Sequence, residues 1–169
     1  MTPFRTAVLV GSLRKDSFNR RLARALEKLA QPRLQFIDIR IDDLPLYCQD
    51  FDAAYPEPAA RLKTQIESAE ALLFVTPEYN RSVPAPLKNA IDVGSRPYGQ
   101  AAFGGKPAAV VSLSQGAMGG FGANHHLRQS LVFLDVPTMQ QPEAYLGNAA
   151  AFFEADGKLK EGPGREFLA

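Results

Sequence analysis

The chain has 169 residues, of which 46% are hydrophobic and 22% are charged, a composition typical of one ordinary globular domain. Its 19 basic and 18 acidic residues leave a net charge of +1, so charge gives no reason to expect nucleic acid or a membrane surface as a partner. The single cysteine, Cys48, excludes an intramolecular disulfide and a CxxC site, and no apolar run is long enough for a signal peptide or a membrane span, so we expect a cytoplasmic protein.

Strands and helices alternate along the first half of the chain. Thr6–Val10 is a short apolar run, typical of a buried strand, and Phe18–Ala30 places leucine and alanine at helical spacing. Leu34–Ile39 predicts a second strand. Residues 42–58 are rich in turn formers and predict a long surface connection, which leads into a helix over Pro58–Ala69.

The second half continues the same alternation. Ala71–Thr76 and Ala108–Leu113 are apolar runs that predict the third and fourth strands. Leu87–Val93 predicts the helix between them, and a further helix is expected from about Ala123 to Leu134. Val136–Met139 is a weaker pattern that we interpret as the fifth strand.

This order predicts an α/β fold, with a doubly wound parallel sheet and helices on both faces. No internal repeat or linker divides the sequence, so we expect a single domain over residues 1–169. Open parallel sheets bind ligands beyond the carboxyl ends of their strands, where the strand order reverses. The loops that leave the first, third and fourth strands are therefore the candidates for a binding site.

The first of these loops is Gly11–Asn19, which leads from a strand into a helix. Free N–H groups and the helix dipole favour an anion such as a phosphate at that place. Ser12, Ser17 and Asn19 add neutral polar groups, and Arg14 adds a charged donor. The loop lacks both G-x-x-x-x-G-K-[ST] and G-x-G-x-x-G, so neither a nucleoside triphosphate nor a classical dinucleotide site is indicated. The alternative is that Ser17 only caps the helix.

The second loop, Thr76–Pro86, contains three prolines that restrict its backbone. Tyr79 and Asn80 at its tip suit the flat face and polar edge of an aromatic ligand. The alternative is a proline-rich turn into the next helix, with Glu78 close to the start of that helix for electrostatic reasons.

The third loop, Ser114–Gly122, has four glycines within seven residues. Such a density of glycine costs conformational entropy, and we interpret it as a close approach of the backbone to a ligand.

No residue of the sequence is a clear catalytic acid, base or metal ligand. His125 and His126 are adjacent on the expected helix and point about 100° apart, so they do not form an i, i+4 metal pair. We interpret both as structural or interfacial. Cys48 has no basic cluster beside it, which favours a buried or incidental thiol over a nucleophile. A phosphatase of similar architecture would need a cysteine in the first loop, and that loop has none.

The three loops resemble those of the NADPH-dependent FMN reductase family of the flavodoxin-like superfamily, and within it the bacterial chromate and quinone reductases. The resemblance rests on GSLRKDSFN, VTPEYNRSVPAPLKNAID and the segments SQGAMGG and HHLRQSLVFLD. It implies a five-stranded sheet of order 2-1-3-4-5. It also implies a set of FMN-binding residues, with the first loop at the phosphate and the other two around the ring: Ser12, Leu13, Arg14, Ser17, Phe18, Asn19, Pro77, Glu78, Tyr79, Asn80, Ser114, Gly116 and Gly119.

The function implied by the resemblance is an oxidoreductase that takes hydride from NADPH or NADH onto FMN. A ping-pong cycle would then reduce a small acceptor such as a quinone, chromate, an azo compound or free flavin. The family also implies a homodimer or homotetramer with an interface near Arg96–Gly104. A flavodoxin-type electron carrier is the alternative, although this near-neutral chain has no acidic docking face. Relatives usually continue into a last helix on the sheet, of which residues 164–169 resemble only the start.

Overall fold

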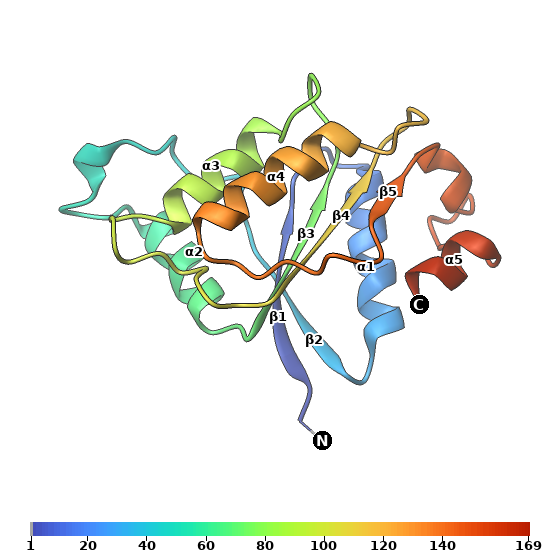
Figure 1. The fold of residues 1–169 in the computed structure, drawn as a ribbon, viewed down its shortest axis with the longest axis horizontal. Helices are drawn as coiled ribbons and strands as arrows, with labels where there is room; N and C mark the ends of the chain where they lie inside the picture. Colours follow the sequence, from blue (N-terminus) through green and yellow to red (C-terminus); the bar gives the residue numbers. More distant parts are fainter. Residues whose placement is uncertain (1) are drawn as a thin grey trace.

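The computed structural model describes residues 2–169, and its centre is a five-stranded parallel sheet (Figure 1). The strand order is β2-β1-β3-β4-β5, so the expected flavodoxin-like topology is confirmed. All neighbouring strands pair in parallel. The strands are β1 (Phe4–Val10), β2 (Leu34–Asp38), β3 (Ala71–Thr76), β4 (Ala108–Leu113) and β5 (Ala144–Leu146).

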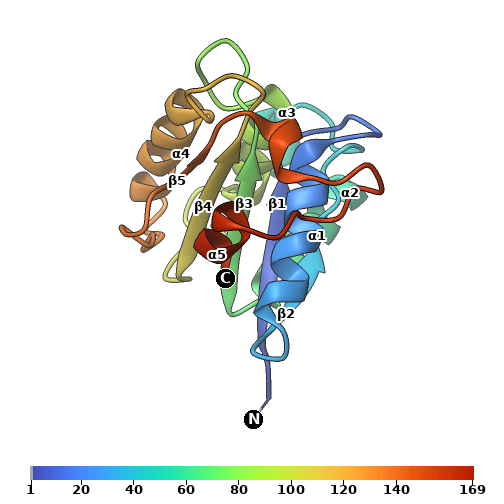
Figure 2. The ribbon, with the colours of Figure 1, turned by 90° about the vertical axis from the view of Figure 1, so that its right-hand side faces the viewer.

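Helices cover both faces of the sheet, with α4 on one side and α1 on the other (Figure 2). Two short 3₁₀ helices, Gln49–Phe51 and Ala149–Phe152, lie in the connections after β2 and β5. None of the described helices is long and apolar enough to cross a membrane. The α-helices are α1 (Phe18–Ala30), α2 (Glu57–Glu67), α3 (Ala85–Gly94), α4 (Phe121–Phe133) and α5 (Pro163–Leu168).

Alternate residues of the strands contribute to two separate hydrophobic cores, one on each face of the sheet. On one face, Leu9 and Phe74 pack under α2, α3 and α4 and are completely buried. On the other face, Val10 and Val75 pack against α1 and the segment after β5. The central strands are therefore mostly apolar on both sides, as their short hydrophobic runs predict.

The α1 face is less completely covered than the other. A groove of about 820 Å³ runs between α1, the face of the sheet and α5, and Leu26, Phe36 and Leu73 are among its apolar walls. The six-residue α5 lies against this face through Leu168 (Figure 2).

The prediction of the fifth strand is wrong. Val136–Met139 forms a single bridge, between Thr138 and Ala108, with two hydrogen bonds to β4. Pro137 has no N–H to donate, and the chain then leaves the sheet and returns at Ala144–Leu146, which pairs with Val111–Leu113. The other predicted elements agree with the structure to within a few residues.

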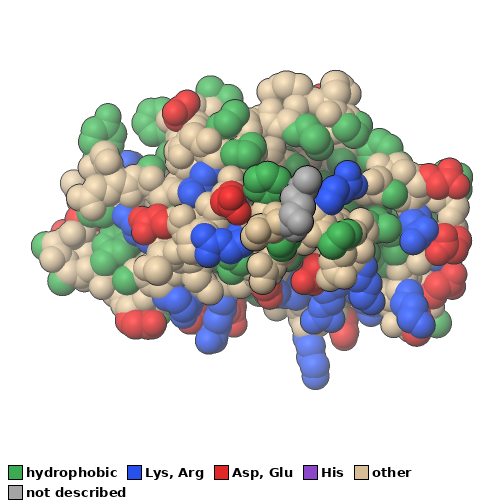
Figure 3. Space-filling model, turned by 90° about the horizontal axis from the view of Figure 1, so that it is seen from below, with side chains coloured by type: hydrophobic (Ala, Val, Ile, Leu, Met, Phe, Trp, Pro, Cys, Tyr) green, Lys and Arg blue, Asp and Glu red, His purple; other side chains and the backbone are tan. Residues whose placement is uncertain are grey.

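The face seen from below in Figure 3 carries lysine and arginine interspersed with aspartate and glutamate. This mixture agrees with the net charge of +1 and gives that face no single sign. The distinctive groups lie instead at the opposite edge, where the strands end.

Candidate cofactor site

The loops after β1, β3 and β4 meet at the carboxyl edge of the sheet and enclose a cavity of about 490 Å³. The apolar groove beside α1 is larger, but it lacks convergent polar groups, so we place the candidate site in the smaller cavity. Its walls are Ser12, Arg14, Ser17, Phe18, Asn19, Pro77, Glu78, Tyr79, Arg81, Leu113, Ser114, Gln115, Gly116, Ala117, Met118 and Ala149.

The first loop leaves several polar groups available to a ligand. Ser17 Oγ accepts from the N–H of Arg20 at 3.3 Å, so Ser17 does cap α1. The backbone N–H groups of residues 12–16 have no acceptor within residues 2–169. Asn19 is only 4% exposed, and its Nδ2 donates to the carbonyl of Leu113 at 3.1 Å. Its buried Oδ1 has no partner among the described residues.

The second loop contains a tight two-residue turn between Tyr79 and Ser82. Tyr79 and Ser82 exchange both backbone hydrogen bonds, at 3.1 and 3.0 Å. Asn80 and Arg81 between them adopt left-handed conformations, with φ of 51° and 63°. This is the geometry of a type I′ hairpin turn, which adds a second restraint to that of the prolines.

Glu78 fixes this loop to α4. Its side chain is 12% exposed, and one carboxylate oxygen accepts from the N–H of Ala123 at 3.1 Å, in the first turn of α4. The other oxygen pairs with Arg81 at 3.2 Å. The electrostatic role considered for Glu78 at a helix start is therefore present, but the helix is α4 and not α3.

The glycines of the third loop mainly serve the packing of the chain on itself, which corrects the ligand-approach interpretation. A Cβ at Gly119 would lie 2.5 Å from the carbonyl carbon of Tyr145, and one at Gly120 would lie 2.9 Å from Ser112 Cβ. A Cβ at Gly122 would lie 2.6 Å from the carbonyl oxygen of Arg81. Gly116 alone among the four has open space around it and lines the cavity.

The two histidines have separate partners. Nδ1 of His126 lies 3.0 Å from Ser82 Oγ, and Nε2 of His125 lies 3.0 Å from the hydroxyl of Tyr145. Burial raises the pKa of Tyr145, and the carboxylate of Glu143 raises it further. Within residues 2–169 no three histidine, cysteine, aspartate or glutamate side chains cluster as a metal site would require.

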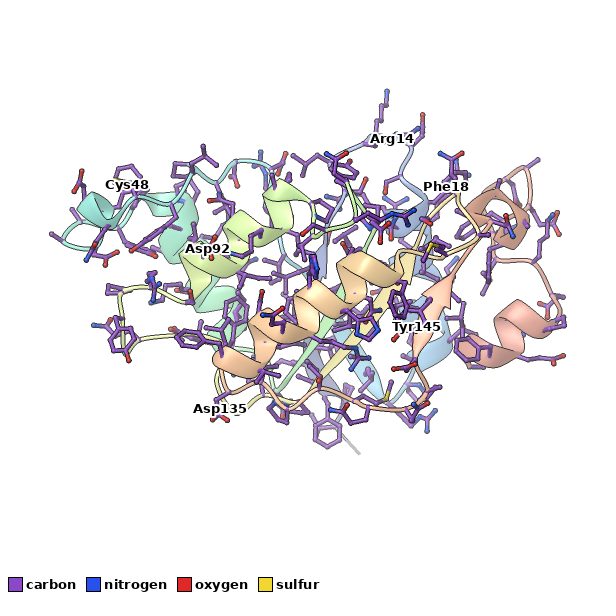
Figure 4. All side chains as sticks on the ribbon, turned by 45° about the horizontal axis from the view of Figure 1, so that its top comes forward. Arg14, Phe18, Cys48, Asp92, Asp135 and Tyr145 are labelled. Carbon is purple, nitrogen blue, oxygen red and sulfur yellow. The ribbon has the colours of Figure 1, made fainter. Side chains whose placement is uncertain are left out.

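Cys48 is exposed, and Figure 4 shows it at the far end of the molecule from Arg14 and Phe18. It contributes nothing to the cavity.

Most of the predicted cofactor-binding residues come together in this cavity. Leu13, Asn80 and Gly119 do not line it. Sequence reasoning did not include Ala149, which follows β5 and depends on the strand that was misplaced. The predicted set of cofactor-binding residues also lacks Arg81. It lacks four further lining residues that are next to predicted ones in the sequence: Leu113, Gln115, Ala117 and Met118.

The cavity suits a phosphate-bearing aromatic cofactor. Its volume lies in the range of small-molecule sites, and it offers Arg14 beside the free N–H groups at the start of α1. The Oδ1 of Asn19, which has no partner within residues 2–169, is available to accept from a hydroxyl donor of a ligand. The backbone N–H groups of residues 115–118 also lack acceptors within residues 2–169. Fold and site together define a flavin-binding protein of the flavodoxin-like class.

Comparison with known proteins identifies the family. The chain belongs to the NADPH-dependent FMN reductase family, whose profile matches residues 4–151. It is 63% identical over 159 residues to a quinone reductase of Pseudomonas putida, covering 94% of this chain and 86% of that protein. A 2-hydroxy-1,4-benzoquinone reductase of Burkholderia is 48% identical over 162 residues, covering 96% of this chain and 88% of that protein.

Among solved structures, FerB of Paracoccus denitrificans, a flavoenzyme NAD(P)H:(acceptor) oxidoreductase, superimposes with a TM-score of 0.92 at 46% identity. The match covers 98% of this chain and 91% of FerB. The chain is accordingly an enzyme with FMN as its cofactor and NAD(P)H as its electron donor.

Proposed function

We propose that this enzyme is a quinone reductase that binds FMN in the cavity at the carboxyl edge of the sheet. The main support for the proposal is the cavity itself, which three loops and the segment after β5 form around unpartnered polar groups. The quinone reductase and 2-hydroxy-1,4-benzoquinone reductase relatives support a quinone as the acceptor.

The chain offers distinct groups for the two ends of FMN. Ser12, Arg14 and Ser17 would hold the phosphate at the start of α1, where the helix dipole favours an anion. Asn19 would accept from a hydroxyl of the cofactor through its free Oδ1. Of the remaining candidates from the sequence, six line the cavity and would border the ring and its linker, whereas Leu13, Asn80 and Gly119 lie outside its walls; the six are Phe18, Pro77, Glu78, Tyr79, Ser114 and Gly116.

FMN, when bound, supplies the hydride chemistry, so the chain needs to supply position and electrostatics. Among the described residues, Glu78 is the one carboxylate that lines the cavity, and it is engaged by Ala123 N–H and Arg81. Within residues 2–169, no unpaired carboxylate, histidine or lysine side chain therefore faces the reactants. The unpaired N–H groups of residues 115–118 are fixed dipoles that would stabilise negative charge at the ring.

One cavity must serve both donor and acceptor, which supports a ping-pong order in which the oxidised nicotinamide leaves before the quinone enters. An open site of this kind also supports the wider acceptor range of chromate, azo compounds and free flavin. We further propose that residues 1–169 form one domain, that this domain assembles as a homodimer or homotetramer near Arg96–Gly104, and that it works in the cytoplasm, where NAD(P)H is available.

A visible spectrum under anaerobic conditions tests this function. The purified protein should show a flavin spectrum that NADPH bleaches and that added 1,4-naphthoquinone restores. Steady-state rates at several quinone concentrations should give parallel double-reciprocal lines. A protein that neither carries nor takes up FMN contradicts the proposal, and an electron carrier without catalysis would oxidise NADPH only at a negligible rate.

A further inference from the structure

Arg81 occupies a backbone position that ordinarily selects for glycine. It is the second central residue of the turn after β3, with φ of 63°. In type I′ turns this position is most often glycine, because a side chain strains the left-handed backbone there. A strained residue beside a ligand cavity suggests that its side chain has a use there.

The turn that carries Arg81 is held rigidly against α4. Glu78 accepts from Ala123 N–H, and His126 pairs with Ser82. Gly122 lets the carbonyl of Arg81 approach the helix to a distance that no Cβ would permit. Three contacts therefore fix the direction in which the Arg81 side chain leaves the turn.

The side chain reaches from the second loop to the third. One guanidinium nitrogen lies 3.2 Å from Glu78 Oε1 and 3.2 Å from the sulfur of Met118. Its other N–H groups have no acceptor within residues 2–169. The Arg81 side chain is itself 70% exposed, and Tyr79 and Met118, which line the cavity with it, are 46% and 55% exposed.

Among the described residues, Arg81 and Arg14 are the two cationic side chains that line the cavity, and they lie on different loops. Arg14 follows β1 and lies with Ser12 and Ser17, the residues proposed to hold the phosphate at the start of α1. The charge of Glu78 is shared between Arg81 and the positive end of α4. Arg81 is thus left with excess positive charge and free donors beside the loops assigned to the flavin ring.

We propose that Arg81 is a specificity-determining residue that selects quinones carrying an anionic group on the ring, such as hydroxyquinones. This inference rests on the proposed function. A hydroxyl on a quinone ring is a vinylogous carboxylic acid and is ionised at neutral pH, whereas its methyl ether is neutral. A guanidinium with free N–H groups matches such an oxyanion, and the flanking Tyr79 and Met118 match the ring.

The competing anion is the 2′-phosphate of NADPH. Two riboses and a pyrophosphate separate that phosphate from the nicotinamide, so in an extended dinucleotide it lies far from the flavin ring. An oxyanion attached directly to the quinone ring is closer to a cation on a ring-lining loop. We therefore assign Arg81 to the acceptor.

The test compares the FMN-loaded enzyme with Arg81→Gln, Arg81→Lys and Arg24→Gln. Arg24 lies on α1 outside the cavity, so its variant removes the same charge at a distance. The acceptors are 2-hydroxy-1,4-naphthoquinone and 2-methoxy-1,4-naphthoquinone, and the readout is the ratio of their kcat/KM values, in which the intrinsic reactivities of the quinones cancel between variants. Calorimetric titration of each quinone into the oxidised enzyme gives the corresponding Kd values without turnover.

Arg81→Gln should lower the ratio of hydroxy- to methoxyquinone about tenfold, and the ratio of their binding constants by a similar factor. Arg81→Lys should recover most of this loss, and Arg24→Gln should leave the ratio at its original value. A ratio unchanged in Arg81→Gln overturns the proposal. So does a variant whose only defect is the ratio of NADPH to NADH in the rate of flavin reduction. An enzyme that reduces neither quinone although it binds FMN would count against the proposed function instead.

Discussion

The loops after β1 and β4 both look ligand-directed in the sequence, yet they use their unusual residues differently. In the loop after β4, Gly119 and Gly120 allow the chain to pack against Tyr145 and Ser112. In the loop after β1, the N–H groups of residues 12–16 and the Oδ1 of Asn19 have no partner within residues 2–169. The comparison teaches that Gly119 and Gly120 indicate close packing of the chain on itself. The polar groups without a partner in the loop after β1 are the better indication of where a ligand would bind.

The largest expected effect separates two glycines of the loop after β4. Gly119→Ala places a Cβ against the backbone of Tyr145 at a φ of 63°, and we expect it to lower the free energy of unfolding by about 3 kcal/mol. Gly116→Ala has open space and should change it by less than about 0.5 kcal/mol. Urea unfolding of the two FMN-free variants measures both values.

For FMN binding the order of the two variants should reverse, with Gly116→Ala having the larger direct effect on the Kd. Gly116 lines the cavity, so its added methyl group should weaken FMN binding in a protein that remains stable. Fluorescence titration with FMN gives the Kd. If Gly116→Ala destabilised the fold as much as Gly119→Ala, the distinction between packing glycines and cavity glycines would fail.

A second, smaller effect compares two buried asparagines. Asn124 donates to Val110, Ser112 and Ala144 and accepts from Arg128, so Asn124→Ala should cost about 2 kcal/mol of stability. Asn19 makes one hydrogen bond and leaves Oδ1 free, so Asn19→Ala should cost about 1 kcal/mol.

For FMN the order of the two asparagines should reverse. Asn19→Ala should raise the Kd about tenfold, because a buried acceptor for the cofactor is lost. Asn124 does not line the cavity and provides the matched control, as a buried asparagine in contact with β4. Chemical unfolding and FMN titration of both variants decide the matter, and equal Kd values would show that the free Oδ1 has no role in binding.

The fold was largely predictable because its strands are buried on both faces. Ala71–Thr76 and Ala108–Leu113 are mostly apolar runs, and their bounds in the structure are those of the sequence prediction. The fifth strand was not predictable in the same way. Ala144–Leu146 has only three residues, and a longer stretch at Val136–Met139 comes shortly before it, held beside β4 by one bridge.

The site was predictable where one loop supplies adjacent residues and not where separate segments meet. Ser12, Arg14 and Ser17 follow from their place between a strand and a helix. The link from Arg81 to Met118 and the position of Ala149 arise from contacts between distant segments. The glycines were misread because sequence shows that the backbone approaches something closely, but not whether that is a ligand or β5.

The last prediction concerns an ion pair that does not line the cavity, and it separates stability from binding. Arg61 on α2 forms two short hydrogen bonds, of 2.7 and 2.8 Å, with the carboxylate of Asp43, and this guanidinium lowers the pKa of Asp43 below its ordinary value of 3.8. Because the folded pKa is lowered, the pair stabilises the fold at pH values above 3.8 and loses that contribution as the pH falls through the folded pKa.

Asp43→Asn should therefore lower the free energy of unfolding by about 1 kcal/mol at pH 7, and the difference from the unmodified chain should shrink towards pH 3. Urea unfolding at a series of pH values measures it. The Kd for FMN at pH 7 should stay the same, because neither Asp43 nor Arg61 lines the cavity. A stability difference that persisted at low pH would assign the effect to packing and not to charge. A change in FMN affinity would show that the loops respond to stability elsewhere in the fold, and the contrast between the β1 and β4 loops would then need variants matched for stability.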